Sequence, residues 1–563
     1  MVARIGTIGH TYRHIKRYRE IVAVLVRHGF GDLITSINLE RHIDFGKKLF
    51  PKKGDAKMAS LSRWERARLA LQELGPTFIK AGQIMSNRPD LLPQGLIAEL
   101  EKLQDAVPPF PEEEAKRLIE EELGAPIPTL FREFTDTPIA AASIAQVHKA
   151  VLQSGESAAV KVQRPGTEQL IEVDTEIMLS LATLMERHLQ GVEILNPVGI
   201  VKEFERSIKK EIDFTIEAMH INRFSRNFRA DATIHVPKVY RDFSTRKILT
   251  MEFIDGIKVS NVNALLEAGN DPHIIADRGA DLVLKQVFEH GFFHADPHAG
   301  NIMILDDNVI CFLDFGMMGG LLPKHREQLG NMIVGIVNRD AKRIIKTALQ
   351  LSRTRHVENM DQLEYEVSEL IDQYYYLPLK DINMGEVLSK LVKLLIGYKV
   401  KFPPDMYLLS KALTTIEGVG RNLDPTFDMV KHTEPFARKL LRERLSARRL
   451  VKDAYLSATE FSLLARDLPS EVREIIEQLK LGQARIEFEH RGLEPALKKG
   501  DQISNRIAFA IVLASLIVGS SLIVLAKTPP TWHEIPIVGI LGFLGAGVMG
   551  FWLLISILRH GRM

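Results

Sequence analysis

The stretch FFHADPHAGNIMILDDNVICFLDFGMM, residues 292–318, carries the strongest functional signal in this sequence. It places His294, Asp296, Asn301 and Asp314 among phenylalanine, isoleucine, leucine and methionine. Polar groups without partners are costly to bury, so these four side chains indicate a functional site. Their order is HxDxxxxN, then a segment patterned like a β-hairpin, then a DFG tripeptide that begins at Asp314.

This order is that of the catalytic and metal-binding residues of protein kinases. Phosphoryl transfer needs a carboxylate beside the attacking hydroxyl and oxygen ligands for the Mg²⁺ that binds the phosphates. Mg²⁺ prefers oxygen ligands and usually takes only one or two protein carboxylates. We therefore predict a site for ATP and Mg²⁺, with Asp296 as the catalytic base and Asn301 and Asp314 as metal ligands. His294 is expected to pack rather than to carry a proton.

A kinase-like site also needs a strand lysine for the α- and β-phosphates and a helix glutamate to pair with it. The segment AAVKV supplies Lys161 inside an alternating strand, and KKEIDFTIEA offers Glu211, Asp213 and Glu217. On one continuous helix, Asp213 and Glu217 share a face at i,i+4 while Glu211 points away. This assigns Glu217 to Lys161. The alternative is that these acids only solvate a helix.

The nucleotide-binding strand and loop can be sought on either side of that lysine. The strand TMEFIDG (250–256) fits a hinge, with Met251 near the adenine and backbone groups of Glu252 and Ile254 facing the base. The loop over the phosphates should be rich in glycine, but here alanine replaces it, and alanine adopts positive φ only at a cost. The way this loop contacts the nucleotide is therefore expected to differ from that in protein kinases with a glycine-rich loop. The predicted ATP contacts of this loop are Pro138, Ile139, Ala140, Ala141, Ala142, Ser143, Ile144, Ala145 and Gln146.

Periodicity along the chain predicts an α+β fold. Residues 146–163 alternate as a β-hairpin, residues 247–256 form another strand, and helical patterns fill residues 60–125 and 322–505. A small sheet followed by a larger helical part would place a cleft between the two.

Two uncharged apolar runs, residues 507–526 and 537–558, lie near the C-terminus. About twenty such residues cross a bilayer as a helix, so we predict a transmembrane hairpin, with Ala546 and Gly550 as a small-residue contact face. Lysine and arginine flank the outer ends, which places both ends in the cytoplasm of a bacterial-type inner membrane. The alternative is a buried hairpin of a soluble protein.

Length, charge and cysteine content limit the number of structural units and the kinds of site the chain can form. A chain of 563 residues predicts two to four units, and a net charge of +2 gives no indication of nucleic-acid binding. Residues 1–60 hold twelve lysine or arginine against five acidic residues, which favours either an anionic membrane surface or a solvated helical face. The single cysteine, Cys311, excludes an internal disulfide and a cysteine-based zinc site.

Together these residues resemble the UbiB family, also called the AarF or ABC-one family, of atypical protein-kinase-like proteins. The family's hallmarks are KxGQ (Lys80 to Gln83), the alanine-rich loop, ExD (Glu211 to Asp213), HADPHAGN and DFG. Ala145 departs from the glycine that the family usually has there.

The resemblance implies a two-lobe kinase-like fold whose N-terminal extension lays KxGQ across the cleft. Lys80, Gln83, Glu211 and Asp213 would then be regulatory, with Lys80 paired to the ExD acids. It also implies Mg-nucleotide binding, ATPase activity stimulated by lipid or quinone precursors, and little protein phosphorylation in trans. The implied domains are basic N-terminal helices (1–60), the KxGQ extension (61–127), an N-lobe with inserted helices (128–256), a C-lobe (257–435), a helical linker (436–505) and two transmembrane helices (506–559).

The leading hypothesis is a membrane-anchored atypical kinase or ATPase that supports ubiquinone (isoprenoid quinone) biosynthesis by handling polyprenylated intermediates. Its expected partners are membrane lipids or quinone precursors, with a quinone-biosynthesis complex and a homo-oligomer as further candidates. A small-molecule or lipid phosphotransferase is the second hypothesis, although KxGQ would crowd its acceptor site. A nucleotide-gated, non-catalytic scaffold is the third.

Overall fold

The computed structural model describes residues 2–36, 61–103, 108–189, 196–352, 354, 357–374, 383–444, 493–532 and 535–560, with isolated helical residues between 458 and 480. The chain divides into two compact units, Met1–Val451 and Lys452–Met563. The division falls inside the predicted linker, most of which lies outside the described residues, as do residues 37–60 of the basic N-terminal segment.

The first unit contains a five-stranded antiparallel sheet in the order β1-β3-β4-β6, with β2 paired to β3. Along β3 the side chains alternate between buried and partly buried positions, as expected for a sheet with one face on the core. The predicted hairpin is confirmed, and Gly155 makes its turn at φ 90°. The strands are β1 (Phe131–Phe134), β2 (Ala140–Ala141), β3 (Ala145–Leu152), β4 (Ser157–Gln163) and β6 (Ile248–Glu252).

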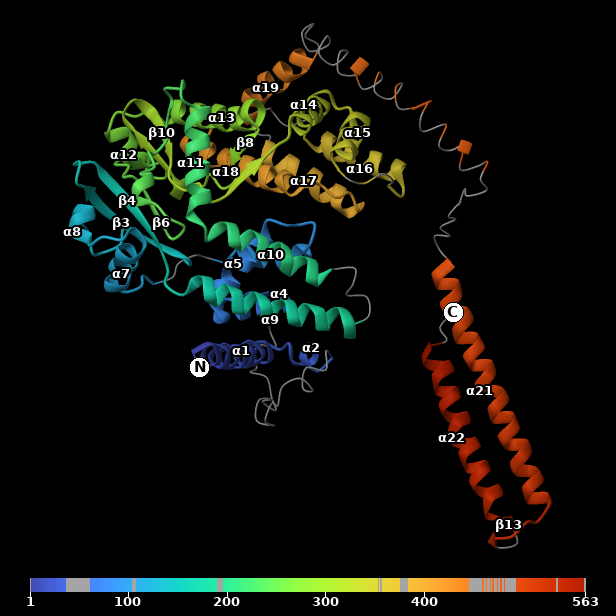
Figure 1. The fold of residues 1–563 in the computed structure, drawn as a ribbon. Helices are drawn as coiled ribbons and strands as arrows, with labels where there is room; N and C mark the ends of the chain where they lie inside the picture. The colour runs from blue at the N-terminus through green and yellow to red at the C-terminus, as the bar shows by residue number, and fades with distance from the viewer. Residues whose placement is uncertain are drawn as a thin grey trace. The chain divides into compact units, whose positions relative to one another are not determined.

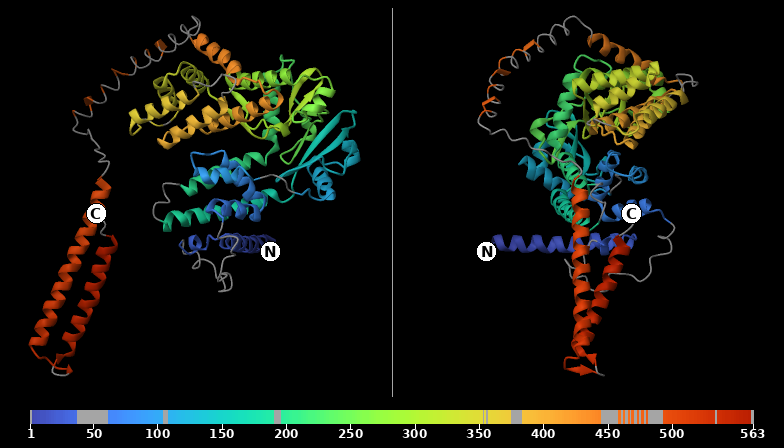
Figure 2. Two further views of the ribbon diagram at one scale, coloured as in Figure 1. Left: turned by 180° about the vertical axis from the view of Figure 1, so that it is seen from behind. Right: turned by 90° about the vertical axis from the view of Figure 1, so that its right-hand side faces the viewer.

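Three helices lie between β4 and β6, as expected for an N-lobe with inserted helices: α9 (Thr167–His188), α10 (Pro197–Glu211) and α11 (Phe214–Asn227). The extension supplies α4 (Arg63–Leu74), α5 (Pro76–Ser86), α6 (Gln94–Leu100) and α7 (Glu112–Leu123). A capping box between Ser62 and Glu65 begins α4. Figures 1 and 2 show α4, α5, α9 and α10 in one layer and the C-lobe helices in another, with the sheet beside them.

The stretch 292–318 folds as short strands and tight loops at the centre of the C-lobe. The strands are β8 (Phe292–His294), β9 (Ile302–Leu305), β10 (Val309–Phe312) and β11 (Met318–Gly320). Antiparallel pairing of β9 with β10 confirms the hairpin between the two motifs. Strands β8 and β11 also pair, with His294 opposite Met318, so the ends of the stretch are brought together. Phe315 of DFG is fully buried and meets Phe224 of α11 edge-to-face at 5.1 Å.

Two C-lobe helices precede the central stretch, α12 (Val262–Glu267) and α13 (Pro272–Leu284). The helices that follow it are α14 (Pro323–Asn338), α15 (Ala341–Leu351), α16 (Met360–Gln373), α17 (Met384–Gly397), α18 (Pro404–Leu423) and α19 (Met429–Arg444). Helix α18 packs against both α13 and β11, so a helix far along the sequence lies against the central stretch.

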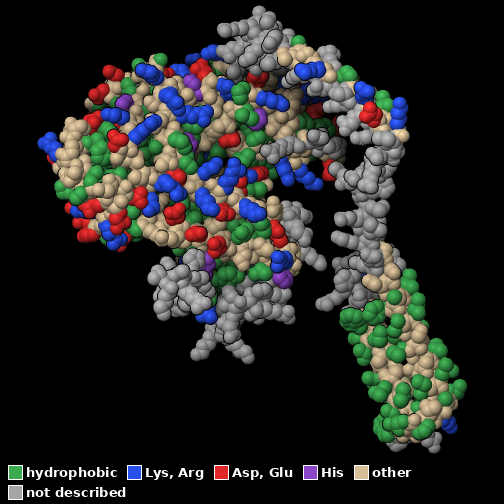
Figure 3. All heavy atoms as spheres, in the orientation of Figure 1, with side chains coloured by type: hydrophobic (Ala, Val, Ile, Leu, Met, Phe, Trp, Pro, Cys, Tyr) green, Lys and Arg blue, Asp and Glu red, His purple; other side chains and the backbone are tan. Residues whose placement is uncertain are grey.

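The second unit is a hairpin of α21 (Leu493–Leu525) and α22 (Ile537–His560). Within these helices, Ser504–Leu525 and Ile537–Leu554 are long and apolar enough to cross a membrane. Figure 3 shows hydrophobic side chains over most of the visible surface of this hairpin. A Cβ at Gly542 would overlap the hydroxyl of Ser520, and Ala546 is buried, so small residues let the two helices approach closely.

His432 of α19 connects this helix to α13 through two aspartates. Its Nδ1 lies 2.9 Å from Asp281 Oδ1, and its Nε2 lies 3.0 Å from Asp277 Oδ1. The hydrogen bond with Asp281 raises the pKa of His432, although burial opposes the shift. A raised folded-state pKa gives stability that is complete below the unfolded pKa of about 6.5 and is lost as the pH rises through the folded value.

We therefore expect His432→Gln to lower the melting temperature clearly at pH 6 and by less at pH 8.5. Thermal denaturation of the detergent-solubilised full chain measures this difference. His188→Gln, at an exposed histidine of α9, is the control. Its effect on the melting temperature should be the same at pH 6 and at pH 8.5. An equal deficit at both pH values would contradict the assignment.

Candidate phosphoryl-transfer site

His294 joins the two motifs of the central stretch. Its Nε2 donates to the carbonyl of Asp314, and its Nδ1 accepts from the backbone N–H of Asp296 at 3.2 Å. Complete burial lowers the pKa of His294, so the ring is neutral and each nitrogen has a fixed role. This geometry agrees with the packing role predicted for His294, because neither nitrogen is left to transfer a proton.

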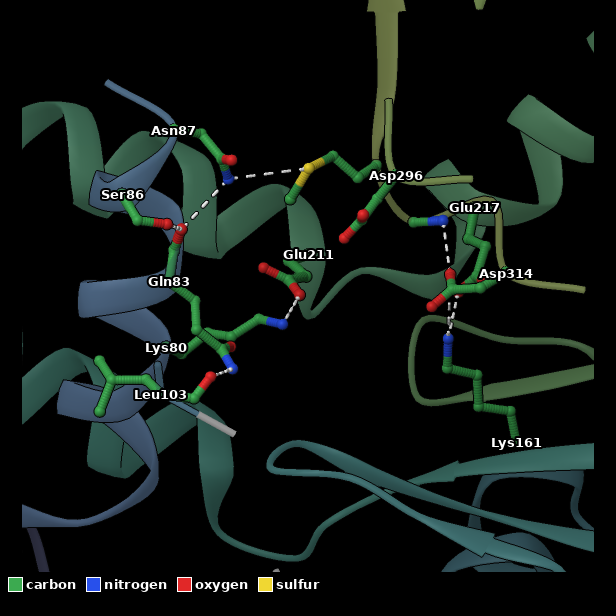
Figure 4. Close-up of polar contacts among 12 residues, drawn as sticks. Lys80, Gln83, Ser86, Asn87, Leu103, Lys161, Glu211, Glu217, Asp296 and Asp314 are labelled. Carbon is green, nitrogen blue, oxygen red and sulfur yellow. Dashed lines mark hydrogen bonds and ion pairs between the residues drawn. The ribbon is translucent and has the colours of Figure 1, made fainter. Parts of the chain in front are cut away.

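Lys161, Glu217 and Asp314 come together from three elements, as Figure 4 shows. The Nζ of Lys161 lies 2.7 Å from Glu217 Oε2 and 4.0 Å from Asp314 Oδ1. Glu217 Oε1 also accepts from the backbone N–H of Phe315 at 3.4 Å. Burial opposes the charge on Lys161, but Glu217 and Asp314 outweigh it and raise the pKa of Lys161. The predicted Lys161–Glu217 pair is therefore present in the structure.

Asp314 and Asn301 offer the oxygen ligands that Mg²⁺ prefers. Burial disfavours the charge of Asp314, but Lys161 and the N–H of Gly316, at 2.8 Å, outweigh it and lower the pKa of Asp314. The carboxylate is thus ionised and half exposed. The carbonyl of Asn301 accepts from Leu313 at 3.0 Å, which places Asn301 beside the DFG loop.

The donor set fits this ion. Among the described residues no cluster of three or more histidine, cysteine or acidic side chains could hold a metal by itself. Mg²⁺ bound with a nucleotide needs only one or two protein carboxylates, because the phosphates supply the other oxygens. Asp314 and Asn301 would hold it there, and their roles as ligands stay predictions.

Asp296 faces a chamber that the sequence did not predict. The chamber has a volume of about 620 Å³ and is walled by α5, α6, α17 and α18, with Asp296 and Met317 in its lining. Lys80 and Gln83 of the KxGQ segment also line it. The extension therefore leaves space beside the predicted base, and the expectation that KxGQ crowds the acceptor site is corrected in this respect.

Lys411 of α18 is a site residue that sequence reasoning missed. Its Nζ lies 3.2 Å from Asp296 Oδ2. The two residues are 115 positions apart in sequence, and Lys411 stands in an amphipathic helix where a lysine is ordinary. Nothing in local periodicity distinguishes it from a solvated side chain.

The KxGQ and ExD residues meet as the resemblance implied, with one correction. Lys80 forms an ion pair with Glu211, and Gln83 Nε2 donates to the carbonyl of Leu103 at 3.2 Å. Figure 4 shows the Lys80–Glu211 pair on one side of Asp296 and the Lys161 cluster on the other. Asp213 instead caps α11 by accepting from Thr215, and it lies 3.3 Å from Arg246.

The prediction that residues 211–217 share one helix is wrong. Helix α10 ends at Glu211, and α11 begins at Phe214, with Asp213 as its N-cap in an extended conformation (φ −100°, ψ 95°). An aspartate favours this position because its side chain satisfies an orphan backbone N–H of the new helix. The i,i+4 argument therefore does not apply, although its assignment of Glu217 to Lys161 agrees with the geometry.

The alanine-rich loop is a tight hairpin. Ala140 and Ala141 pair with β3, and the N–H of Ala142 donates to the carbonyl of Ala145 at 2.8 Å. None of its residues adopts a positive φ, as expected without glycine. Ser143 is buried, and its Oγ has no hydrogen-bond partner in the structure. Contacts of this loop with a nucleotide stay predictions.

Two predicted nucleotide contacts have side chains with other partners. The Gln146 side chain is fully buried, where it accepts from the N–H of Phe110 and bonds to His148. The Glu252 carboxylate lies 3.0 Å from His235 Nε2 and accepts from the N–H of Lys238. Backbone contacts of Glu252 and Ile254 with the base stay predictions.

Comparison with known proteins identifies the family. A model of the ABC1 atypical kinase-like domain matches residues 102–348, a UbiB helical domain model matches 367–428, and a model of the ABC1/UbiB kinase-like C-terminal domain matches 491–559. A protein named probable protein kinase UbiB, from Marinobacter nauticus, is 34% identical over 82% of this chain and 85% of its own. The chain belongs to the ABC1/UbiB family of atypical kinase-like proteins.

One further relative covers this UbiB-family chain almost completely, and one solved structure covers part of it. An uncharacterized protein in the hydrogenase 1 5′ region of Clostridium pasteurianum is 35% identical over 98% of this chain and 100% of its own. A Mycobacterium tuberculosis protein solved in complex with erythromycin is 23% identical. The match spans 63% of this chain and 86% of the Mycobacterium tuberculosis chain, with a TM-score of 0.44. The family assignment rests on the sequence matches alone.

Removing one member of the buried pair should cost far more than removing both. We expect Glu217→Ala in this UbiB-family protein to lower the free energy of unfolding by about 3 kcal/mol. The largely buried Lys161 would lose its nearest partner and keep only the half-exposed carboxylate of Asp314, 4.0 Å away. The double change Lys161→Met with Glu217→Leu should cost less, since apolar side chains of similar volume replace the pair. Chemical denaturation of the full chain measures both.

The matched control is Glu205→Ala, which breaks an exposed i,i+4 pair with Lys209 on α10 and should cost about 0.5 kcal/mol or less. A Glu217→Ala cost as small as that of the control would show that the Lys161 pair is not energetically buried.

Proposed function

We propose that this protein is a membrane-anchored atypical kinase or ATPase that uses Mg-ATP to support ubiquinone (isoprenoid quinone) biosynthesis. The single observation that carries this proposal is the convergence of Lys161, Glu217 and Asp314, with Asp296 fixed beside them through His294. That arrangement supplies the lysine–glutamate pair, the metal-binding aspartate and the catalytic carboxylate of a kinase-like site.

Each residue has a task that follows from its charge and surroundings. Lys161, held charged by Glu217, binds the α- and β-phosphates. Asp314 and Asn301 hold Mg²⁺, which neutralises negative charge on the phosphates when it is bound. Asp296 orients the attacking water or hydroxyl and accepts its proton. The alanine-rich hairpin covers the nucleotide as a short strand pair rather than as a flexible glycine loop.

The membrane part of the proposal rests on the second unit. Helices α21 and α22 expose apolar side chains over lengths that match a bilayer core. We propose that they anchor the kinase-like body on the cytoplasmic side of a bacterial-type inner membrane, where polyprenylated intermediates are accessible. Membrane lipids or quinone precursors would then be its partners, within a quinone-biosynthesis complex or a homo-oligomer.

A second candidate function is favoured by the chamber beside Asp296. A volume of about 620 Å³ lies within the usual range of small-molecule sites, and its lining combines apolar side chains with hydroxyl and amide groups. A small-molecule or lipid acceptor bound there would have its hydroxyl near the predicted base. Labelled ATP that produces a phosphorylated lipid or alcohol would favour this function over simple hydrolysis.

Asp314→Asn should lower ATP turnover to about 1% or less of the wild-type value, since single electrostatic groups of a transition state contribute about 10²–10³ in kcat. The variant should still fold and insert. Phosphate release from purified protein in lipid vesicles measures turnover. The control Asp306→Asn changes an exposed acid in the turn between β9 and β10 and should leave turnover unchanged.

Retained turnover in Asp314→Asn would refute the assignment of the site. Nucleotide binding without phosphate release from the wild type, with lipid present, would instead support a nucleotide-gated scaffold. The biosynthetic role is tested by quinone profiling of a deletion strain complemented with the wild type or with Asp296→Ala. Unchanged quinone levels would overturn that part of the proposal.

A further inference from the structure

Lys411 is brought to the predicted catalytic base by α18, a C-lobe helix that lies beyond the residues matched by the ABC1 kinase-like model. The kinase-like match ends at residue 348, and α18 lies within the helical-domain match 367–428. Lys411 Nζ and Asp296 Oδ2 are 3.2 Å apart. The helical domain therefore places a charge at the centre of the site.

The position of Lys411 is set by its neighbours on α18. Leu409 and Ala412 are fully buried, and Ser410 and Leu413 are nearly so. With these side chains packed into the core, the helix cannot rotate to move Lys411 away from Asp296. Lys411 itself is 39% exposed and Asp296 32% exposed, and both line the chamber. The pair is thus accessible to a ligand, while the neighbours of Lys411 on α18 are packed in the core.

Several lysines surround the chamber, since Lys80 and Lys393 also line it, but among the described residues it is Lys411 that pairs with Asp296. Residues 297–300, between Asp296 and Asn301, include no lysine or arginine. Lys161 forms its ion pair with Glu217, and Lys80 forms one with Glu211. His294 holds the backbone N–H of Asp296, and Lys411 of α18 contacts its carboxylate.

We propose that Lys411 is a positioning residue for Asp296, so that the helical domain completes the phosphoryl-transfer site. This inference rests on the proposed function. Lys411 holds the carboxylate toward the chamber. There Asp296 accepts the proton of a water or hydroxyl group. At the same time the oxygen of that water or hydroxyl group bonds to the γ-phosphorus of ATP. The bond from that phosphorus to the β–γ bridging oxygen breaks, and ADP leaves with the electron pair.

The positioning role can be distinguished from a purely stabilising ion pair, because the two roles predict different effects on melting temperature and on kcat. Partly exposed pairs contribute little to folding, so loss of Lys411 should leave the melting temperature nearly unchanged. Misplacing a catalytic group by about 1 Å can cost about 10²-fold in rate. The effect of a positioning residue therefore appears in kcat, while the KM for ATP, set mainly by Lys161 and the hinge, changes little.

The test compares Lys411→Ala and Lys411→Arg with the wild type as purified full-length protein in lipid vesicles. We expect Lys411→Ala to lower kcat about 10-fold to 100-fold, with the KM for ATP within about twofold of wild type. Lys411→Arg should recover most of the rate because it restores a cation near Asp296 Oδ2. The matched control is Lys390→Ala, at an exposed lysine of α17 that is paired with Glu386 at 2.8 Å and lies outside the chamber lining.

Two further measurements separate positioning from other roles. In an Asp296→Ala background, Lys411→Ala should cause no additional loss, because Lys411 acts through that carboxylate. The inference is overturned if Lys411→Ala keeps wild-type kcat. It is also overturned if the loss in kcat matches a loss in melting temperature without rescue by arginine. Absence of ATP turnover in the wild type would contradict both the proposed function and this inference. A fully active Lys411→Ala variant would contradict the inference alone.

Discussion

The buried ion pair between Lys161 and Glu217 constrains the whole kinase-like body. It joins a central strand of the sheet to the first turn of α11, and Asp314 lies near enough to share the lysine's charge. Because unpaired buried charges are so costly, α11 must return to the sheet at this point. The break after α10, capped by Asp213, lets the chain make that return.

The same constraint reaches the catalytic loops through His294. A neutral, buried imidazole bonds to the backbone of both Asp296 and Asp314, so the predicted base and the predicted metal ligand keep a fixed relation. Phe315 packs against α11 from the other side. The DFG loop is therefore held by a charge contact, a hydrogen bond and an aromatic contact that come from different parts of the chain.

The departures from an ordinary kinase site all lie around Asp296 and the phosphate loop. The KxGQ helix, α6 and the helical domain enclose a chamber where an open protein-substrate surface would otherwise be expected, and Lys411 enters it from α18. The alanine-rich hairpin has ordinary backbone angles where a glycine loop would use its freedom. Under the proposed function, these features would admit a small molecule or water beside the phosphate in place of a polypeptide.

Sequence alone determined the order HxDxxxxN and DFG, the strand around Lys161 and the two long apolar helices. Each of these signals is local: fixed spacing, two-residue alternation or an uncharged run. It also identified Glu217, although through a continuous helix that the structure breaks at Asp213.

Tertiary structure decided the contacts that join distant segments. The pairing of Lys411 with Asp296, the chamber and the close approach of Gly542 to Ser520 depend on how helices pack. A lysine on an amphipathic helix has the same sequence pattern whether it faces solvent or the carboxylate of a predicted catalytic residue. Only the burial of its neighbours on the folded chain fixes which of these it meets.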